Sequence, residues 1–262
     1  MNKHIVRDGK ATAKHFDTRN LQNDYATLIP LLKAGMRVLD VGCGTGAISK
    51  GIAELVGTSG HVTGMDHTEA FISSGKETYN SISNLELIHA DLFTFEPEEK
   101  YDLIVSARVL QWLSNPKEAL QKLKSLLKPG GQVSILDYNH EALEWQPEPP
   151  QSMRIFYQTF LKWRADAGMS NHIAEDLAGY LQETGFHSIE VLNADEVYKK
   201  GEANFMSKIA IWSQVAGSRQ MVDEGYITDE ARLQAIEEYN QWIETDARLM
   251  VMKLKETRGK ID

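Results

Sequence analysis

A glycine-rich segment at residues 38–46, with the sequence VLDVGCGTG, has the residue types and spacing of a ligand-binding turn. Its three glycines can take backbone conformations that other residues avoid, and they let a ligand approach the main chain closely. Where such a turn joins a strand to a helix, the N–H groups that begin the helix point toward the ligand. The segment also satisfies the G-x-G-x-x-G/A pattern of dinucleotide-binding turns, so the glycines alone leave more than one ligand class open.

Three carboxylates accompany the glycine turn and indicate which ligand it takes. Asp40 lies two residues before the first glycine, where it would repel a pyrophosphate and attract a cationic group. Asp66 ends a second apolar segment and is placed to accept hydrogen bonds from ribose hydroxyls, a role that would fit NAD equally well. Asp91 follows a third apolar segment, where it can accept from an adenine amino group while Leu92 packs on the ring. The set favours a cationic ligand without phosphate over a dinucleotide.

Alternating apolar strands and amphipathic helices are predicted to position these residues. Strands are expected at residues 36–41, 61–65, 85–88, 101–106 and 132–138, and helices at 21–33, 47–56 and 113–127. Because parallel strands need a crossover helix between them, this alternation predicts an α/β fold with a doubly wound, mostly parallel, seven-stranded sheet, helices on both faces and an additional helical cover. The ligand is expected at the carboxyl ends of the strands.

The second half of the chain departs from this alternation and suggests a division into segments. Three prolines interrupt residues 144–150, and helices are predicted at 152–167, 175–184, 203–215 and 229–247, with strands at 186–192 and 249–254. We expect an N-terminal cap or flap helix in residues 1–34, a cofactor-binding core in 35–140 and a helical insertion in 141–174. Residues 175–262 are expected to complete the core, with a further helical insertion at 203–247.

Composition limits the function classes. The formal net charge is −9, from 28 Lys and Arg against 37 Asp and Glu, which opposes nonspecific attraction to nucleic acid or anionic lipid. The one cysteine, Cys43, excludes an intramolecular disulfide and has no partner for a metal site, so no metal is expected. The polar start of the sequence and the absence of a long apolar stretch lead us to expect a cytoplasmic protein with a small-molecule partner, no nucleic acid and no membrane.

Taken in order, the motifs resemble those of class I S-adenosylmethionine-dependent methyltransferases, in particular small-molecule methyltransferases of type 11 or 25. The resemblance rests on residues 38–46, Asp66, residues 90–91, residues 101–106 and residues 126–131, and it covers about the first half of the chain. It implies a Rossmann-like fold, S-adenosylmethionine as the cofactor and methyl transfer to the O, N or C atom of a small molecule by in-line displacement. S-adenosylmethionine carries an ammonium and a sulfonium but no phosphate, which agrees with the position of Asp40.

The resemblance also implies roles for individual residues. Asp40 and the glycine turn would lie near the methionine moiety, the Ser106 backbone near its amino group, Asp66 on the ribose, and Asp91 with Leu92 at the adenine. Thr45 would begin the helix beneath the ligand. The complete set of expected cofactor-binding residues is Tyr25, Asp40, Gly42, Cys43, Gly44, Thr45, Gly46, Asp66, His67, Ala90, Asp91, Leu92 and Ser106.

Residues that would act on the acceptor are less clearly marked, because methyl transfer needs no obligatory base. A Gln111–Trp112 pair resembles a pair found in methyltransferases that esterify small carboxylates, such as the trans-aconitate type, and Arg108 could pair with a carboxylate. The alternative is that Trp112 belongs to the core and that Arg108 is a surface side chain. Tyr138 and His140, which follow the fifth strand, are candidate bases or structural residues.

Two further groups are predicted either to cover the site or to pack the core. His15, Phe16 and Tyr25 lie where relatives place a flap. Aromatic and apolar side chains at helical spacing could line a substrate pocket or form ordinary core: Met153, Phe156, Tyr157, Phe160, Trp163, Phe205, Met206, Ile209 and Trp212. Two other functions remain as alternatives, a non-catalytic S-adenosylmethionine-binding protein and an NAD-dependent oxidoreductase, and the latter is disfavoured by Asp40.

Overall fold

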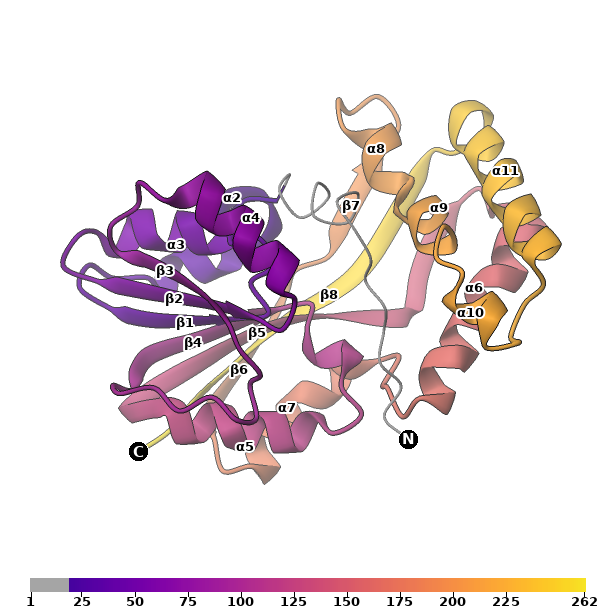
Figure 1. Ribbon diagram of the computed structural model, residues 1–262. Coiled ribbons are helices and arrows are strands. Elements are labelled where there is room, and N and C mark those ends of the chain that lie inside the picture. The colour runs from indigo at the N-terminus through magenta and orange to yellow at the C-terminus, as the bar shows by residue number, and fades with distance from the viewer. Residues whose placement is uncertain (1–18) are drawn as a thin grey trace. The chain divides into compact units, whose positions relative to one another are not determined.

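The computed structural model describes residues 19–262, which divide into two compact units (Figure 1). Within this range the larger unit comprises residues 19–137, 173–194 and 255–262, and the smaller unit comprises residues 138–172 and 195–254. The glycine turn and every predicted cofactor-binding residue belong to the larger unit.

The larger unit is built on a sheet whose strand order is β3-β2-β1-β4-β5-β8-β6. Strands β1 to β5 pair in parallel, and β6 pairs with β8 in the antiparallel direction. The strands are β1 (Arg37–Val41), β2 (His61–Asp66), β3 (Leu85–His89), β4 (Tyr101–Ala107), β5 (Leu127–Gln146), β6 (His187–Asn193) and β8 (Leu249–Lys260). The central position of β1 brings the glycine turn next to the ends of β2 and β4.

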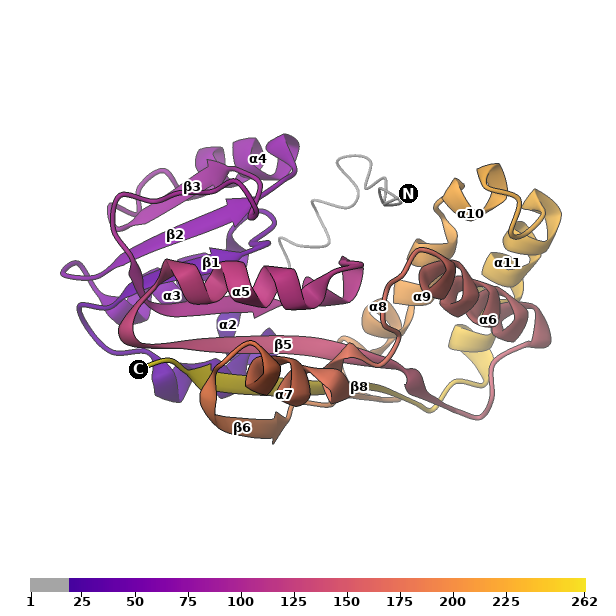
Figure 2. The ribbon, with the colours of Figure 1, turned by 90° about the horizontal axis from the view of Figure 1, so that it is seen from below.

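Helices cover both faces of this sheet. Helices α2 (Leu21–Asp24), α3 (Ala47–Val56) and α4 (Glu69–Tyr79) lie on one face, and α5 (Pro116–Leu126) and α7 (Ile173–Glu183) lie on the other (Figures 1 and 2). Apolar side chains of β1, β4, α5 and α7 form one buried cluster between the sheet and the second helical layer, including Leu39, Ile104, Leu123 and Leu177. The predicted doubly wound α/β class is therefore confirmed.

The prediction of one continuous helix at residues 21–33 is wrong. The chain instead forms the short helix α2 and then a 3-10 helix, η1 (Ala26–Leu31), separated by Tyr25 with an extended φ of −155°. The Asp24 carboxylate accepts a hydrogen bond from Asn20 N at 2.8 Å, which closes α2 on itself. Pro30 lies inside η1 and has no N–H to donate, so a continuous α-helix is disfavoured there.

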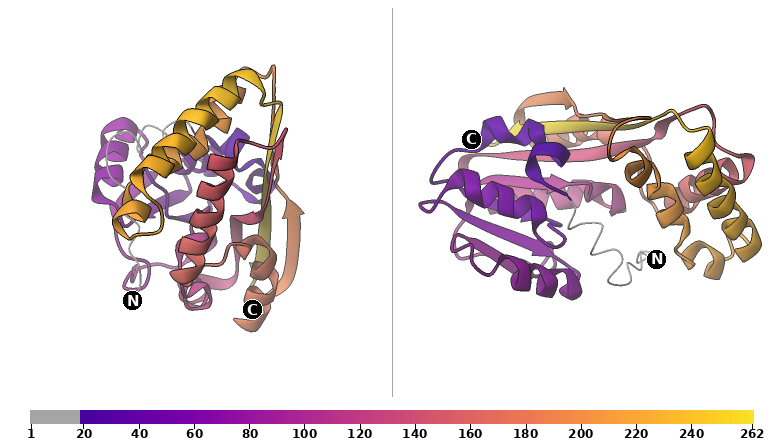
Figure 3. Two further views of the ribbon diagram at one scale, coloured as in Figure 1. Left: turned by 90° about the vertical axis from the view of Figure 1, so that its right-hand side faces the viewer. Right: turned by 90° about the horizontal axis from the view of Figure 1, so that it is seen from above.

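The smaller unit is mainly helical. It contains α6 (Gln151–Asp166), α8 (Phe205–Ile209), α9 (Ile211–Ala216), α10 (Gln220–Asp223) and α11 (Asp229–Thr245), and α6 and α11 lie side by side (Figure 3). Strand β7 (Glu196–Lys199), which the sequence pattern did not indicate, pairs antiparallel with the first part of β8. Because of β7, the sheet in residues 19–262 has eight strands rather than the predicted seven.

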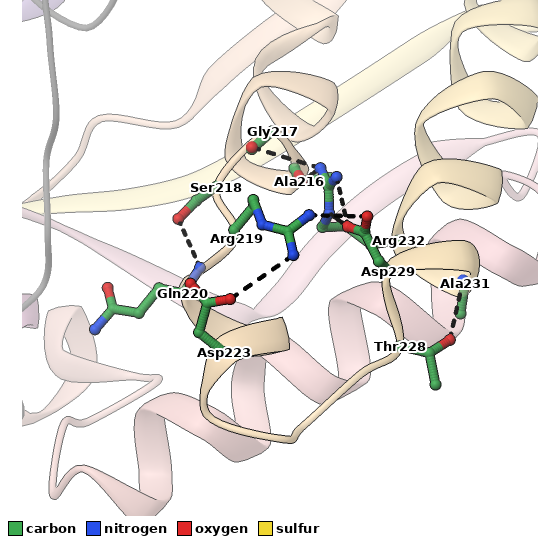
Figure 4. Close-up of polar contacts among 10 residues, drawn as sticks. All are labelled: Ala216, Gly217, Ser218, Arg219, Gln220, Asp223, Thr228, Asp229, Ala231 and Arg232. Atoms are coloured by element: carbon green, nitrogen blue, oxygen red, sulfur yellow. Dashed lines mark hydrogen bonds and ion pairs between the residues drawn. The ribbon is translucent and has the colours of Figure 1, made fainter.

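A polar cluster joins α9, α10 and α11 within the smaller unit (Figure 4). Arg232 Nη1 donates to the carbonyl of Ala216 at the end of α9 at 2.9 Å, and Arg232 Nη2 lies 2.7 Å from Asp229 Oδ1. Arg219 Nη1 lies 2.8 Å from Asp229 Oδ2 and also approaches Asp223. The two arginines therefore share one carboxylate, and their hydrogen bonds lower the pKa of Asp229.

Candidate functional site

The glycine turn between β1 and α3 has the left-handed conformation that its sequence predicts. The φ values of Gly42, Gly44 and Gly46 are 71°, 59° and 86°, a region that favours glycine. The backbone N–H groups of Gly42 and Cys43 both donate to Met65 O, at 2.8 and 3.0 Å. The turn is thus held against the end of β2, next to the carboxylate that follows.

Asp66, the predicted ribose partner, also stabilises the turn itself. Its Oδ2 accepts a hydrogen bond from Gly44 N at 2.9 Å, and its Oδ1 accepts one from Thr68 N at 2.8 Å. The side chain is buried, while His67 is exposed and its Nδ1 lies 3.4 Å from Asp66 Oδ1. Each carboxylate oxygen can accept a second hydrogen bond, so this arrangement is compatible with binding ribose hydroxyls.

Asp40 is buried on β1 beneath the turn and is 3% exposed. Ser49 Oγ, on α3, donates to Asp40 Oδ2 at 2.6 Å. Burial, with a smaller contribution from the charge of Asp66, raises the pKa of Asp40 to about 6, although the hydrogen bond from Ser49 acts in the opposite direction. Burial and these two carboxylates also raise the pKa of the Cys43 thiol well above its ordinary value. The turn therefore has an electronegative environment, which suits a cationic ligand.

The end of β4 lies directly beside the turn. Ser106 is opposite Val41 in the β1–β4 register, and its Oγ donates to Val41 O at 3.2 Å. Val109 packs so closely on Gly42 that a Cβ added at this glycine would be 2.4 Å from Val109 Cγ2. Gly42 is therefore required both by its backbone conformation and by its neighbour.

The predicted adenine-binding segment follows β3 at the same edge of the sheet. Ala90 N donates to Asp66 O at 3.1 Å, and Asp91 Oδ1 accepts from Phe93 N at 2.8 Å. The Asp91 side chain is exposed and Leu92 is half-buried. Parallel pairing of β1 with β2 and β4, and of β2 with β3, thus brings the expected residues together at one edge.

The hydroxyl of Thr45 bears on whether a polar ligand fits the turn. Helix α3 begins at Ala47 with Gly46 as its N-cap, so Thr45 precedes the helix rather than beginning it. Thr45 is 1% exposed, and within residues 19–262 its Oγ1 is buried without a hydrogen-bond partner. An unpartnered buried polar atom between the glycines of the turn fits a site that takes a polar group.

Tyr25 is buried in the larger unit. Its hydroxyl lies 2.7 Å from Ser134 Oγ on β5, and Ser134 Oγ donates to Glu256 Oε1 on β8 at 2.5 Å. Burial, reinforced by the charge of Glu256, raises the pKa of the Tyr25 phenol. The phenol thus anchors the N-terminal segment to the sheet, and its contact with the cofactor stays a prediction. His15 and Phe16 lie outside the described residues.

Arg108 and Gln111 are both buried after β4. Arg108 Nη2 donates to Asp24 O at 3.1 Å, and Gln111 Nε2 donates to Arg108 O at 3.2 Å. Gln111 N donates to Asp137 Oδ2 at 3.1 Å. These contacts connect the segment after β4 with the N-terminal segment and with the end of β5; pairing of Arg108 with a substrate carboxylate stays a prediction.

Tyr138 and His140 belong to the smaller unit. The His140 ring is buried, with the rings of Tyr138, Phe160 and Trp212 at centroid distances of 5.2, 5.9 and 6.0 Å. Burial, followed by the charge of Arg164, lowers the pKa of His140 well below its ordinary value. The imidazole is therefore neutral near pH 7, but its low basicity makes it a weak general base.

The aromatic set proposed for a substrate pocket forms the core of the smaller unit. The rings of Tyr157 and Trp212 meet edge to face at 4.6 Å, and Trp145 adds a ring 5.1 Å from that of Tyr157. Met206 is exposed, whereas the other predicted members are buried: Met153, Phe156, Tyr157, Phe160, Trp163, Phe205, Ile209 and Trp212. A role in acceptor binding stays a prediction.

Three residues with clear roles in this site were not recognised from the sequence. They are Ser49, which donates to Asp40, Val109, which packs on Gly42, and Glu256, which accepts from Ser134. Ser49 had a usable signal, because it is a polar residue among the apolar side chains of α3. Glu256 had no local sequence signal, since its partner Ser134 lies 122 residues away in the sequence.

Comparison with known proteins defines the family. A family model for the methyltransferase domain matches residues 32–202. The demethylmenaquinone methyltransferase of Staphylococcus aureus strain MRSA252 is 34% identical over 113 residues, which are 43% of this chain and 47% of that protein. This chain thus spans about half the length of that relative. Since the family model matches more than half of the sequence, the chain belongs to the methyltransferase-domain family.

Solved structures agree in fold. The phosphoethanolamine N-methyltransferase 2 of Haemonchus contortus has a TM-score of 0.56 and 17% identity over 90% of this chain and 52% of that one. An S-adenosylmethionine-dependent methyltransferase from Aquifex aeolicus has a TM-score of 0.52 and 24% identity over 72% of this chain and 91% of that one. The predictions of a Rossmann-like methyltransferase and of S-adenosylmethionine as its cofactor are confirmed at the level of the family. In the part of the chain that is described, no helix is long and apolar enough to cross a membrane.

Proposed function

We propose that this protein transfers a methyl group from S-adenosylmethionine to a small-molecule acceptor. The observation that carries the proposal is the glycine turn with two buried carboxylates, Asp40 and Asp66, at the carboxyl ends of adjacent strands. A dinucleotide would bring a pyrophosphate into this electronegative region, whereas a sulfonium and an ammonium are stabilised there. A non-catalytic binding protein is the remaining alternative.

The residues at the sheet edge would hold and orient the cofactor. S-adenosylmethionine supplies a methyl group on a sulfonium that is ready for displacement by a nucleophile. We propose that Asp66 binds the ribose hydroxyls, that Asp91 and Leu92 contact the adenine, and that Asp40 stabilises positive charge beneath the turn. Because an in-line displacement depends mainly on alignment and exclusion of water, the protein would act chiefly by positioning.

Titration calorimetry with S-adenosylhomocysteine, S-adenosylmethionine and NADH tests the cofactor. We expect binding of the first two and none of NADH; the reverse result would refute the proposal. Gly44→Ala places a Cβ at a φ of 59° inside the turn and should weaken S-adenosylhomocysteine binding at least tenfold. Gly57→Ala is the matched control, because Gly57 has a φ of 67° at the far end of α3 and a Cβ added there would meet no atom within 4 Å.

For the acceptor, we propose an apolar aromatic molecule such as a quinol. The staphylococcal relative is named for methylating demethylmenaquinone. Four of the five tryptophans in the chain, at positions 145, 163, 212 and 242, lie in the smaller unit. We propose that segments 141–172 and 203–247 of this unit select the acceptor. The negative net charge would also disfavour anionic acceptors.

An acceptor panel decides between these classes. The panel would include a reduced naphthoquinone, a tricarboxylic acid, a phosphorylated ethanolamine and a simple phenol. Each compound would be incubated with S-adenosylmethionine, and mass spectrometry would detect methylation as a mass increase of about 14 daltons, the mass of one added CH₂ group. Methylation of the quinol or phenol supports the proposal. Methylation of the tricarboxylic acid alone would replace it with the carboxylate hypothesis based on Arg108, and cofactor binding with no turnover would favour a binding protein.

A further inference from the structure

The backbone of Arg108 is strained at the edge of the candidate site. Its φ is 63°, in the left-handed region that residues other than glycine, asparagine and aspartate rarely occupy. Among residues 19–262, Ser188 is the other non-glycine residue with a positive φ, and it lies on β6. Such strain persists only where surrounding contacts impose it, so the contacts of Arg108 indicate what it does.

Main-chain contacts hold Arg108 on both sides. Its N–H donates to Leu136 O on β5 at 2.6 Å, and its carbonyl accepts from Gln111 Nε2 at 3.2 Å. Gln111 is in turn fixed by Asp137 Oδ2, which accepts from Gln111 N. The chain therefore turns sharply at Arg108 as it leaves β4, with both peptide groups used in hydrogen bonds.

The guanidinium of Arg108 contacts the N-terminal segment. Nη2 donates to the carbonyl of Asp24, at the end of α2, and the Arg108 side chain is buried. Asp24 precedes Tyr25, whose hydroxyl is held by Ser134 on β5. The segment after β4 and the N-terminal segment are thus fastened to each other and to the sheet.

Val109, the residue after Arg108, connects this fixed segment with the glycine turn. Val109 packs on Gly42 within a space that admits no Cβ. Because Arg108 determines the direction in which the chain leaves β4, its conformation determines where Val109 meets Gly42. We propose that Arg108 is a positioning residue that fixes the geometry of the glycine turn for the cofactor. This inference rests on the proposed function, because it assigns the turn to S-adenosylmethionine.

Hydrogen exchange in the protein without ligand tests this role independently of catalysis. The amides of Gly42, Cys43 and Gly44 are hydrogen-bonded and report on the turn. Arg108→Gly removes the guanidinium that donates to Asp24 O, and glycine at this position can leave the left-handed conformation freely, so we expect these amides to exchange at least tenfold faster. Arg108→Lys keeps the charge and much of the length and should restore part of the protection. Ser188→Gly relieves the same kind of strain away from the turn and should leave these amides unchanged.

Amides of helix α7, in the same unit, separate a local effect from a global one. If they accelerate in Arg108→Gly by the same factor as the turn amides, the effect is general destabilisation and the inference is overturned; wild-type exchange at the turn overturns it as well. For S-adenosylhomocysteine, we expect calorimetry to give a dissociation constant at least tenfold higher for Arg108→Gly, and unchanged binding would also overturn it. Failure of the wild-type protein to bind would instead refute the proposed function, while the exchange data would still decide whether Arg108 orders the turn.

Discussion

Replacing Asp40 with asparagine should stabilise the protein above pH 6. The carboxyl group has a pKa raised from 3.8 to about 6 by burial and by Asp66, so the folded state holds the proton more tightly than the unfolded state. The contribution of Asp40 is therefore most favourable below about pH 4, and it is lost as the pH rises through 6. A shift of about 2 pKa units corresponds to roughly 3 kcal/mol of unfavourable free energy at pH 8.

Asp40→Asn removes this penalty and retains an oxygen that can accept from Ser49. We expect its melting temperature at pH 8 to exceed that of the wild type by up to about 6–12 °C, with the difference shrinking toward zero at pH 4. Differential scanning calorimetry across this range measures the effect, and Glu77→Gln, which removes an exposed acid on α4, is the control. A melting difference that does not depend on pH would show that Asp40 is not a buried, destabilising charge.

The same variant should lose affinity for the cofactor. A cation bound near Asp40 favours its ionised form. Near pH 6, where this carboxyl is about half protonated, S-adenosylmethionine binding by the wild type should therefore release up to about half a proton per molecule, and Asp40→Asn should bind at least tenfold more weakly without that release. Calorimetry in two buffers of different ionisation enthalpy measures the proton. Equal affinity and equal proton release in both proteins would refute an electrostatic role for this carboxylate.

Three further variants test the packing on which the two units depend. Leu123→Ala should destabilise the protein by about 2–5 kcal/mol because it opens a cavity under α5, and urea unfolding would measure the loss. Thr228→Ala removes the side-chain cap that accepts from Ala231 N on α11 and should cost about 1 kcal/mol in the same assay. Arg232→Met keeps much of the side-chain volume but removes the donor to the Ala216 carbonyl and to the Asp229 carboxylate, so the free energy of unfolding should fall by about 1–3 kcal/mol. For each of the three variants, a loss below about 0.5 kcal/mol, the usual scatter for surface substitutions, would contradict the prediction.

Local patterns were sufficient to predict the elements around the glycine turn. Helix α3 lies within its predicted limits, since Gly46 and Gly57 mark its two ends and its buried face is apolar apart from Ser49. The positions of Asp40, Asp66 and Asp91 at one edge also followed from strand order, because parallel strands end at the same side of the sheet.

Features that depend on distant partners could not be predicted. Strand β5 was expected to stop near residue 138 but continues to Gln146, and β8 continues past residue 254 to Lys260, where it pairs with β6. The break between α2 and η1 falls at Tyr25, whose hydroxyl contacts Ser134, 109 residues away in the sequence, although Pro30 was a local signal against a continuous helix. Arg108 was expected to be either a partner for a carboxylate or a surface side chain. The surface alternative is wrong, because Arg108 is buried and its guanidinium contacts Asp24, 84 residues away in the sequence.

The place of β8 in the sheet has a consequence for synthesis on the ribosome. β6 is translated well before β8, yet β8 lies between β5 and β6 in the sheet. Until residues 255–260 emerge, the nascent chain presents β5 with an open hydrogen-bonding edge and β6 without its partner. Residues 195–254 of the smaller unit are made during this interval. We therefore expect stalled or incomplete chains to be the species that chaperones and proteases capture, whereas closure of the sheet by β8 marks completion of the larger unit.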